Sequence, residues 1–273
     1  MKTILVPIDF SEQSHMALST AVALSKREPA QVHIVHMLEL DVRKSERVTD
    51  QLRERTDFLV SSAQKTMTAF LGDSEFRGNN FIVHYKAFKV FKEIGELVDS
   101  IGAELIVMGS HGTDGMRELF IGSNTEKVVR NSTVPVLVVK NGTYDMDPHT
   151  AIIASDLAEE GVSALKRAIA FAKKYRLFLE VVNVRKADGK GEGNSEPADK
   201  FALLLGDASN ALPFTVLKGD KVEETVLAYA RDKGTGLIIV PTHGRKGLEH
   251  FFRGSIGEDV ANHAHTAVLT LRI

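Results

Sequence analysis

The sequence predicts an α/β protein made of two similar domains, each with a parallel sheet that helices cover on both faces. Two observations carry this prediction. Short apolar runs alternate with longer segments of helical period along the chain. The same motifs also occur twice in the same order, which is typical of a tandem duplication. The chain has 273 residues, and at about 150 residues per domain this length favours two domains.

The first half of the chain alternates strands with helices from its start. An apolar run over residues 3–8 precedes a helical pattern from Ser11, and a second run over 32–38 precedes a longer helical pattern. The remaining predicted elements are a strand over 81–85, a helix over 91–101, a strand over 105–108, a short helix after Ser123 and a strand over 136–139.

The second half repeats this order with a shorter middle. Its predicted elements are a strand around Ile152, a helix over 159–174, strands over 179–184 and 214–217, a helix from Val222, and strands over 237–240 and 268–271. Residues 187–197 are rich in Gly, Lys, Glu and Ser, which predicts a loop. The turn-rich segment between the halves places the two domains at 1–142 and 148–273.

The composition excludes several classes of protein. Lys and Arg number 34 and Asp and Glu 36, so the net charge of -2 gives no basic surface for nucleic acid or an anionic membrane. The absence of Cys excludes disulfides, thiol catalysis and cysteine metal sites. The histidines show no metal-ligand spacing, and no apolar stretch reaches about 18 residues. We therefore expect a cytoplasmic protein with no metal site and no nucleic-acid or membrane partner.

Two motifs lie where parallel sheets bind ligands, beyond the carboxyl ends of the strands. Asp9 ends the first strand, and Gly109-Ser-His-Gly112 follows the strand over 105–108, with Gly122-Ser123 nine residues later. If these two strands are neighbours, both motifs face one crevice. Glycines let the backbone approach a ligand, and a helix that starts after Gly122 offers free N–H groups to an anion such as a phosphate chain. Ser123, with Asn124 or Thr125, can add hydrogen-bond donors.

Simpler interpretations of these residues stay open. Glycines after a strand also form plain turns, and Asp9 could cap the helix that follows it. His111 and His243 occupy matching positions in the two halves, where packing or hydrogen bonding is a simpler role than catalysis. We therefore expect no catalytic residue.

The combination of Pro7-Ile8-Asp9, Gly109-x-x-Gly112 and Gly122-Ser123 resembles the universal stress protein family in its tandem two-domain form. The resemblance implies two Rossmann-like (adenine nucleotide alpha hydrolase-like) domains, each a five-stranded parallel sheet of order 3-2-1-4-5. It also implies a bound ATP or AMP, with or without Mg²⁺. Asp9 and the Met37 backbone would hold the adenine and ribose side. The nucleotide-binding residues it implies are Pro7, Ile8, Asp9, Met37, Gly109, Gly112, Gly122, Ser123 and Asn124.

The second half departs from this pattern. Pro241 stands where the first glycine belongs, and its ring fixes φ at the point of closest approach. The loop over 245–253 is nevertheless basic, which favours an anion. A second anion site would consist of Asp156, Gly244, Arg245, Gly254 and Ser255.

From this resemblance we expect a stress-response regulator that binds an adenine nucleotide mainly in the first domain. The sequence has no Gly-x4-Gly-Lys-Ser/Thr phosphate loop, so we expect no enzyme, with slow ATP hydrolysis left open. The alternative is an interaction scaffold whose two sites are vestigial. We also expect the two halves to pack as a pseudo-dimer within the chain, and two chains could form a homodimer.

Overall fold

The computed structural model describes residues 2–38, 50–87, 90–110, 122–140, 150–186, 196–242 and 266–272. Contacts divide this part of the chain into two compact units, one with the described residues up to Val139 and one with those from Lys140 onward. The positions of the domain boundaries, 1–142 and 148–273, stay predictions. None of the helices in the described ranges combines the length and the apolar character that crossing a bilayer requires.

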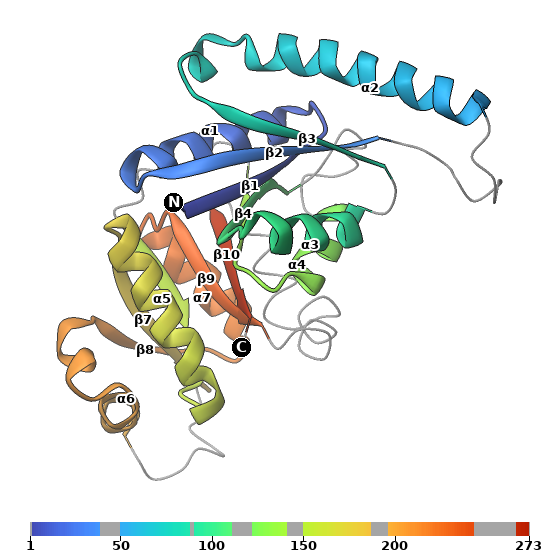
Figure 1. Ribbon diagram of the computed structural model, residues 1–273. Helices are drawn as coiled ribbons and strands as arrows, with labels where there is room; N and C mark the ends of the chain where they lie inside the picture. The colour runs from blue at the N-terminus through green and yellow to red at the C-terminus, as the bar shows by residue number, and fades with distance from the viewer. Residues whose placement is uncertain are drawn as a thin grey trace. The chain divides into compact units, whose positions relative to one another are not determined.

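The first unit contains a parallel sheet of five strands in the order β3-β2-β1-β4-β5 (Figure 1). The strands are β1 Lys2–Ile8, β2 Ala30–Leu38, β3 Phe81–Ala87, β4 Leu105–Gly109 and β5 Val136–Val139. This confirms the expected order 3-2-1-4-5. It also makes β1 and β4 neighbours, because Ile4 pairs with Leu105. The carboxyl ends of these two strands therefore lie side by side at one edge of the sheet.

Four helices pack on this sheet. They are α1 Glu12–Arg27, α2 Asp50–Leu71, α3 Val90–Ile101 and α4 Ser123–Asn131, with a short 3-10 turn at Ser74–Phe76. Right-handed crossovers place α1 and α2 on one face and α3 and α4 on the other, where α3 and α4 lie side by side (Figure 1). Helix α1 starts at its N-cap Ser11, whose side chain accepts from the Ser14 N–H, and it buries Leu18 and Leu24 against the sheet.

The second unit has the same strand order, β10-β9-β6-β7-β8. Its strands are β6 Thr150–Ala154, β7 Phe178–Arg185, β8 Phe214–Lys218, β9 Leu237–Thr242 and β10 Ala267–Arg272. Its helices are α5 Val162–Tyr175, α6 Pro197–Leu205 and α7 Val222–Asp232. Because β6, β7, β8, β9 and β10 repeat the order of β1 to β5, the structure confirms two doubly wound α/β domains.

Two helical details of the second unit differ from the prediction. The helix predicted over 159–174 starts with a 3-10 turn, Glu159–Gly161, and becomes α-helical only at Val162. The helix α6 was not among the predicted elements; it has Pro197 in its first turn and buries Phe201 against Phe214 of β8. The ring centroids of this aromatic pair lie 4.5 Å apart. Most of the predicted loop over 187–197 lies outside the described residues.

Candidate functional site

The end of β1 forms a tight turn around the carboxylate of Asp9. Its Oδ1 accepts from the backbone N–H of Ser11 at 3.0 Å and from the Ser11 hydroxyl at 2.5 Å. The N-cap of α1 is Ser11 and not Asp9, so the interpretation of Asp9 as the cap is wrong. Asp9 instead holds the capping residue in place, and it stays exposed at the carboxyl edge of the sheet.

Phe10, between these two residues, has a φ of 66°. The left-handed region is unfavourable for a bulky residue, and such positions cost about 1–3 kcal/mol each. The Phe10 ring packs against His36 of β2, with 4.4 Å between the ring centroids, and against Phe70 of α2. This packing offsets the backbone strain and fixes the direction in which Asp9 leaves the sheet.

His36 makes a second contact with the end of β1. Its Nδ1 lies 2.8 Å from the carbonyl oxygen of Ile8, the residue directly before Asp9. Because a carbonyl oxygen can only accept, His36 donates from Nδ1. Met37, for which the resemblance implies a backbone contact with the adenine, comes next on β2 and pairs with Lys86 of β3.

The end of β4 is tied to the start of α4. The Ser110 N–H donates to the carbonyl of Val139 at 3.0 Å, and the Gly122 N–H donates to the carbonyl of Ser110 at 2.7 Å. The buried hydroxyl of Thr125 donates to the carbonyl of Gly109 at 2.9 Å. Thr125 therefore positions the helix, and its predicted alternative use as a donor to an anion is wrong.

The first turn of α4 is the part of the site that could hold an anion. No side-chain hydrogen bond caps the helix at Gly122, within the residues described, and the side chains of Ser123 and Asn124 are exposed. The partial positive charge of a helix N-terminus therefore faces outward at the edge where β4 ends. Gly112, which completes the glycine motif, lies outside the described residues.

The close approach of a neighbouring helix requires a glycine at position 109. A Cβ placed on it would lie 2.7 Å from the Cβ of Gln13 and 2.9 Å from the Gln13 carbonyl carbon. Real Cβ atoms essentially never come this close. The close packing of α1 against β4 therefore requires a glycine at position 109, and the contact of Gly109 with a ligand stays a prediction.

The second unit repeats the turn at the end of its first strand. Asp156 Oδ1 accepts from the Ala158 N–H at 2.9 Å, and Leu157 has a φ of 58°. Asn183 Nδ2 donates to the carbonyl of Ser155 at 2.8 Å. Each contact has its counterpart at Asp9, Phe10 and His36 of the first unit. Of the predicted second anion site only Asp156 is described, since Gly244, Arg245, Gly254 and Ser255 lie outside the described residues.

Pro241 explains the later start of α5. It occupies β9 at the position that Gly109 has in β4, opposite Leu271 of β10. A proline ring leaves no room for a helical turn packed as Gln13 is against Gly109. Helix α1 begins three residues after Asp9, whereas α5 begins six residues after Asp156, with a 3-10 turn between.

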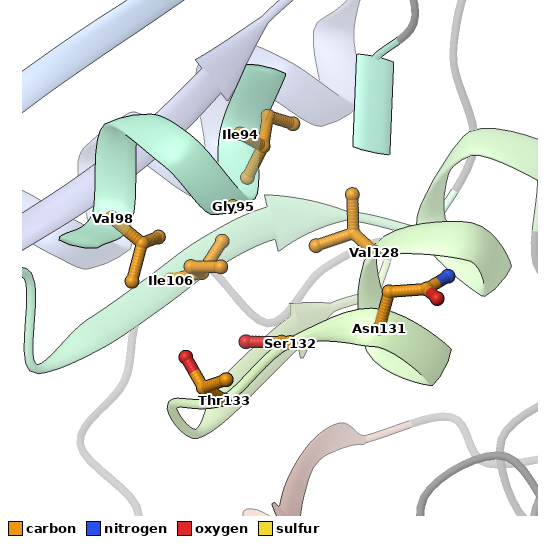
Figure 2. Close-up of a pocket in the computed structure, with 8 residues that line it drawn as sticks. All are labelled: Ile94, Gly95, Val98, Ile106, Val128, Asn131, Ser132 and Thr133. Carbon is orange, nitrogen blue, oxygen red and sulfur yellow. The ribbon is translucent and has the colours of Figure 1, made fainter. Parts of the chain in front are cut away.

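A small pocket lies between α3 and α4, away from these strand ends (Figure 2). Ile94, Val98, Ile106 and Val128 give it apolar walls, and Asn131 marks the far end of α4 from Gly122. Its cavity volume of about 10 Å³ is enough for about one water molecule. This pocket is therefore a packing gap, and it is too small for a nucleotide.

The two sheets of equal strand order, each with an aspartate turn at the end of its first strand, define the chain as a tandem of doubly wound α/β domains. The chain belongs to the universal stress protein family, because the model of the "Universal stress protein family" matches residues 1–140 and again residues 149–272.

Two curated relatives each match about half of the chain, and one solved structure matches nearly all of it. Universal stress protein MJ0577 of Methanocaldococcus jannaschii is 28% identical over 156 residues, which are 51% of this chain and 94% of that protein. Universal stress protein G of Escherichia coli O157:H7 is 28% identical over 142 residues, 51% of this chain and 99% of that protein. The crystal structure of a universal stress protein from Archaeoglobus fulgidus DSM 4304 covers 99% of this chain and 96% of its own, with a TM-score of 0.74 and 18% identity. This last similarity concerns the fold of the whole tandem.

Proposed function

We propose that this stress protein binds an adenine nucleotide in its first unit and that occupancy of the site regulates its interactions. The observation that carries the proposal is the first turn of α4. It starts at Gly122, which has no side chain of its own to cap the helix, it exposes Ser123 and Asn124, and it is fixed to the end of β4 by the Thr125 hydroxyl. A helix start held in place in this way is preorganised for a phosphate group.

The other end of the ligand would contact the turn at Asp9. An ionised carboxylate only accepts hydrogen bonds, so Asp9 suits ribose hydroxyls or the amino group of a base and repels phosphate. The start of α4 thus favours an anion, and the turn at Asp9 favours donor groups. A nucleotide carries both kinds of group, and the resemblance of Gly109 and Gly122-Ser123 to the family's motif supports ATP or AMP, with or without Mg²⁺.

The proposed role is binding and signalling without chemistry. Incubation of the purified protein with ATP, followed by chromatography for ADP, tests whether slow hydrolysis accompanies binding. We further propose that the protein acts in the cytoplasm, with a pseudo-dimer of its two halves as the working unit.

Ser123→Glu tests the site without weakening the fold. A glutamate in the first turn of a helix is favourable for the helix dipole, so the melting temperature should be maintained. The same carboxylate would repel the phosphates. We expect ATP affinity to fall at least about tenfold, because a charged hydrogen bond contributes about 1.5–3 kcal/mol and tenfold corresponds to about 1.4 kcal/mol. Adenosine affinity should stay unchanged.

Ser61→Glu is the matched control, since Ser61 is exposed on α2 and the substitution adds the same charge. Calorimetric titration of ATP and adenosine measures both affinities. Equal ATP binding by the wild-type protein and the Ser123→Glu variant would show that α4 does not hold the phosphates. No binding of either compound to the wild-type protein would remove the proposed function and favour an interaction scaffold.

A further inference from the structure

The contact between His36 and Ile8 links β2 to the last peptide of β1. The register pairs these two residues directly, and the His36 ring donates from Nδ1 to the Ile8 carbonyl at 2.8 Å. Ile8 precedes Asp9, and the left-handed residue Phe10 follows, with its ring against His36. One side chain thus holds the peptide before Asp9 by a hydrogen bond and the residue after it by packing.

The second unit makes the same contact with a different side chain. Asn183 lies on β7 beyond the pair Ala154–Val182, and its Nδ2 donates to the carbonyl of Ser155 at 2.8 Å. The residue after Asp156, Leu157, is again left-handed and only 2% exposed. His and Asn share little except a donor at this distance from the backbone. The donor to the strand-end carbonyl is therefore the property that both units retain.

The same hydrogen bond and left-handed residue occur beside two different adjacent strands. In the first unit the adjacent strand β4 ends in Gly109, and in the second unit the adjacent strand β9 contains Pro241. The hydrogen bond and the left-handed residue are the same in both cases. The turn therefore depends on the donor from the second strand and not on the glycine loop.

We propose that His36 is a positioning residue for the nucleotide site, which fixes the Ile8–Asp9 peptide and with it the groups that meet the base and ribose. This inference rests on the proposed function of the first unit. It assigns His36 to the nucleoside end of the ligand, whereas Ser123 belongs to the phosphate end. Loss of the donor should therefore weaken ATP and adenosine equally.

The test compares two substitutions of His36. His36→Leu removes the donor and keeps a side chain of similar bulk, and we expect about tenfold weaker binding of both ATP and adenosine. His36→Asn keeps a donor of the kind found at Asn183 and should bind both compounds within about threefold of the wild-type protein. Asn183→Leu is the matched control, because it removes the same hydrogen bond from the second unit and should leave binding to the first unit unchanged.

Three results of these titrations would overturn the proposal. They are wild-type affinity in His36→Leu, weaker binding of ATP without weaker binding of adenosine in His36→Leu, and binding by His36→Asn that is as weak as binding by His36→Leu. Nitrogen NMR of the wild-type protein gives a readout that needs no variant, since His36 should carry its proton on Nδ1 both free and with adenosine. A neutral His36 with the proton on Nε2 would contradict the proposed role of His36.

A wild-type protein that binds neither compound would refute the proposed function and this inference together. Binding that the His36→Leu substitution leaves intact would refute the inference alone.

Discussion

Substitution of Gly109 by alanine tests how closely α1 approaches β4. The added methyl group would lie 2.7 Å from the Gln13 Cβ, 2.9 Å from its carbonyl carbon and 3.0 Å from its carbonyl oxygen. Two of these atoms belong to the backbone, so a side-chain rotation cannot relieve the contact. The first turn of α1 would have to move, together with the cap at Ser11 and the Asp9 carboxylate bonded to it.

The expected cost follows from this overpacking. Extra methyl groups in a well-packed interior typically destabilise by about 1–3 kcal/mol. With about 2–4 °C lost per kcal/mol in a domain of this size, the melting temperature of the first unit should fall by about 6 °C. Differential scanning calorimetry of the full chain measures this shift.

Gly95→Ala is the control with the opposite sign. Gly95 lies inside α3, and a Cβ there would meet no atom within 4 Å. Alanine is favoured over glycine in a helix by about 0.5–1 kcal/mol, so this variant should melt higher than the wild-type protein. If Gly109→Ala melted at or above the wild-type temperature, α1 would not pack against β4 as described, and the explanation of Pro241 and the late start of α5 would fail with it.

Two further predictions concern polar side-chain contacts, one buried and one partly buried. Thr125→Val keeps the shape of the side chain but removes the hydroxyl donor that lies 2.9 Å from the Gly109 carbonyl oxygen. Urea denaturation should show that the free energy of unfolding falls by about 1–2 kcal/mol. Unchanged stability would contradict the link between β4 and α4. His33 Nδ1 and His84 Nε2 lie 2.9 Å apart, burial lowers the pKa of both from 6.5, and the charges of His33 and Lys86 lower the pKa of His84 further. Because the unfolded chain then binds protons more readily, the stability that the neutral pair contributes is present above about pH 6.5 and is lost as the pH falls below it. The melting temperatures at about pH 7.5 and 5.5 should differ more in the wild-type protein than in His84→Gln. The hydrogen bond between the two rings contributes about 1 kcal/mol to the free energy of unfolding. An equal difference in both proteins would refute this prediction.

Much of the fold could be predicted from the sequence because the inner strands, such as β4, are short apolar runs that are buried on both faces of the sheet. The order 3-2-1-4-5 came from the resemblance and is confirmed in both units. We did not predict the helix α6, whose nine residues follow a polar segment and bury Phe201 against Phe214. A contact between distant segments leaves no periodic signal in so short a helix.

The candidate site was predicted in its residues but not in its contacts. Asp9 and Gly122 follow from their places after a strand and before a helix. The role of His36 depends on the register between β1 and β2, which spacing along the chain does not contain. For Gly109 we predicted the close approach of a ligand, and the structure adds the close approach of Gln13, which by itself requires a glycine there. Both features depend on which elements meet in space, and the sequence shows only which elements exist.

The most direct test of the account is a calorimetric titration of ATP into the purified protein after any bound small molecule has been removed by denaturation and refolding. We expect saturable binding of one ATP per chain, retained in Ser61→Glu and weakened at least about tenfold in Ser123→Glu. Absence of binding heat in the refolded wild-type protein, or equal affinity in both variants, would contradict it and would mean that the first turn of α4 serves the fold alone.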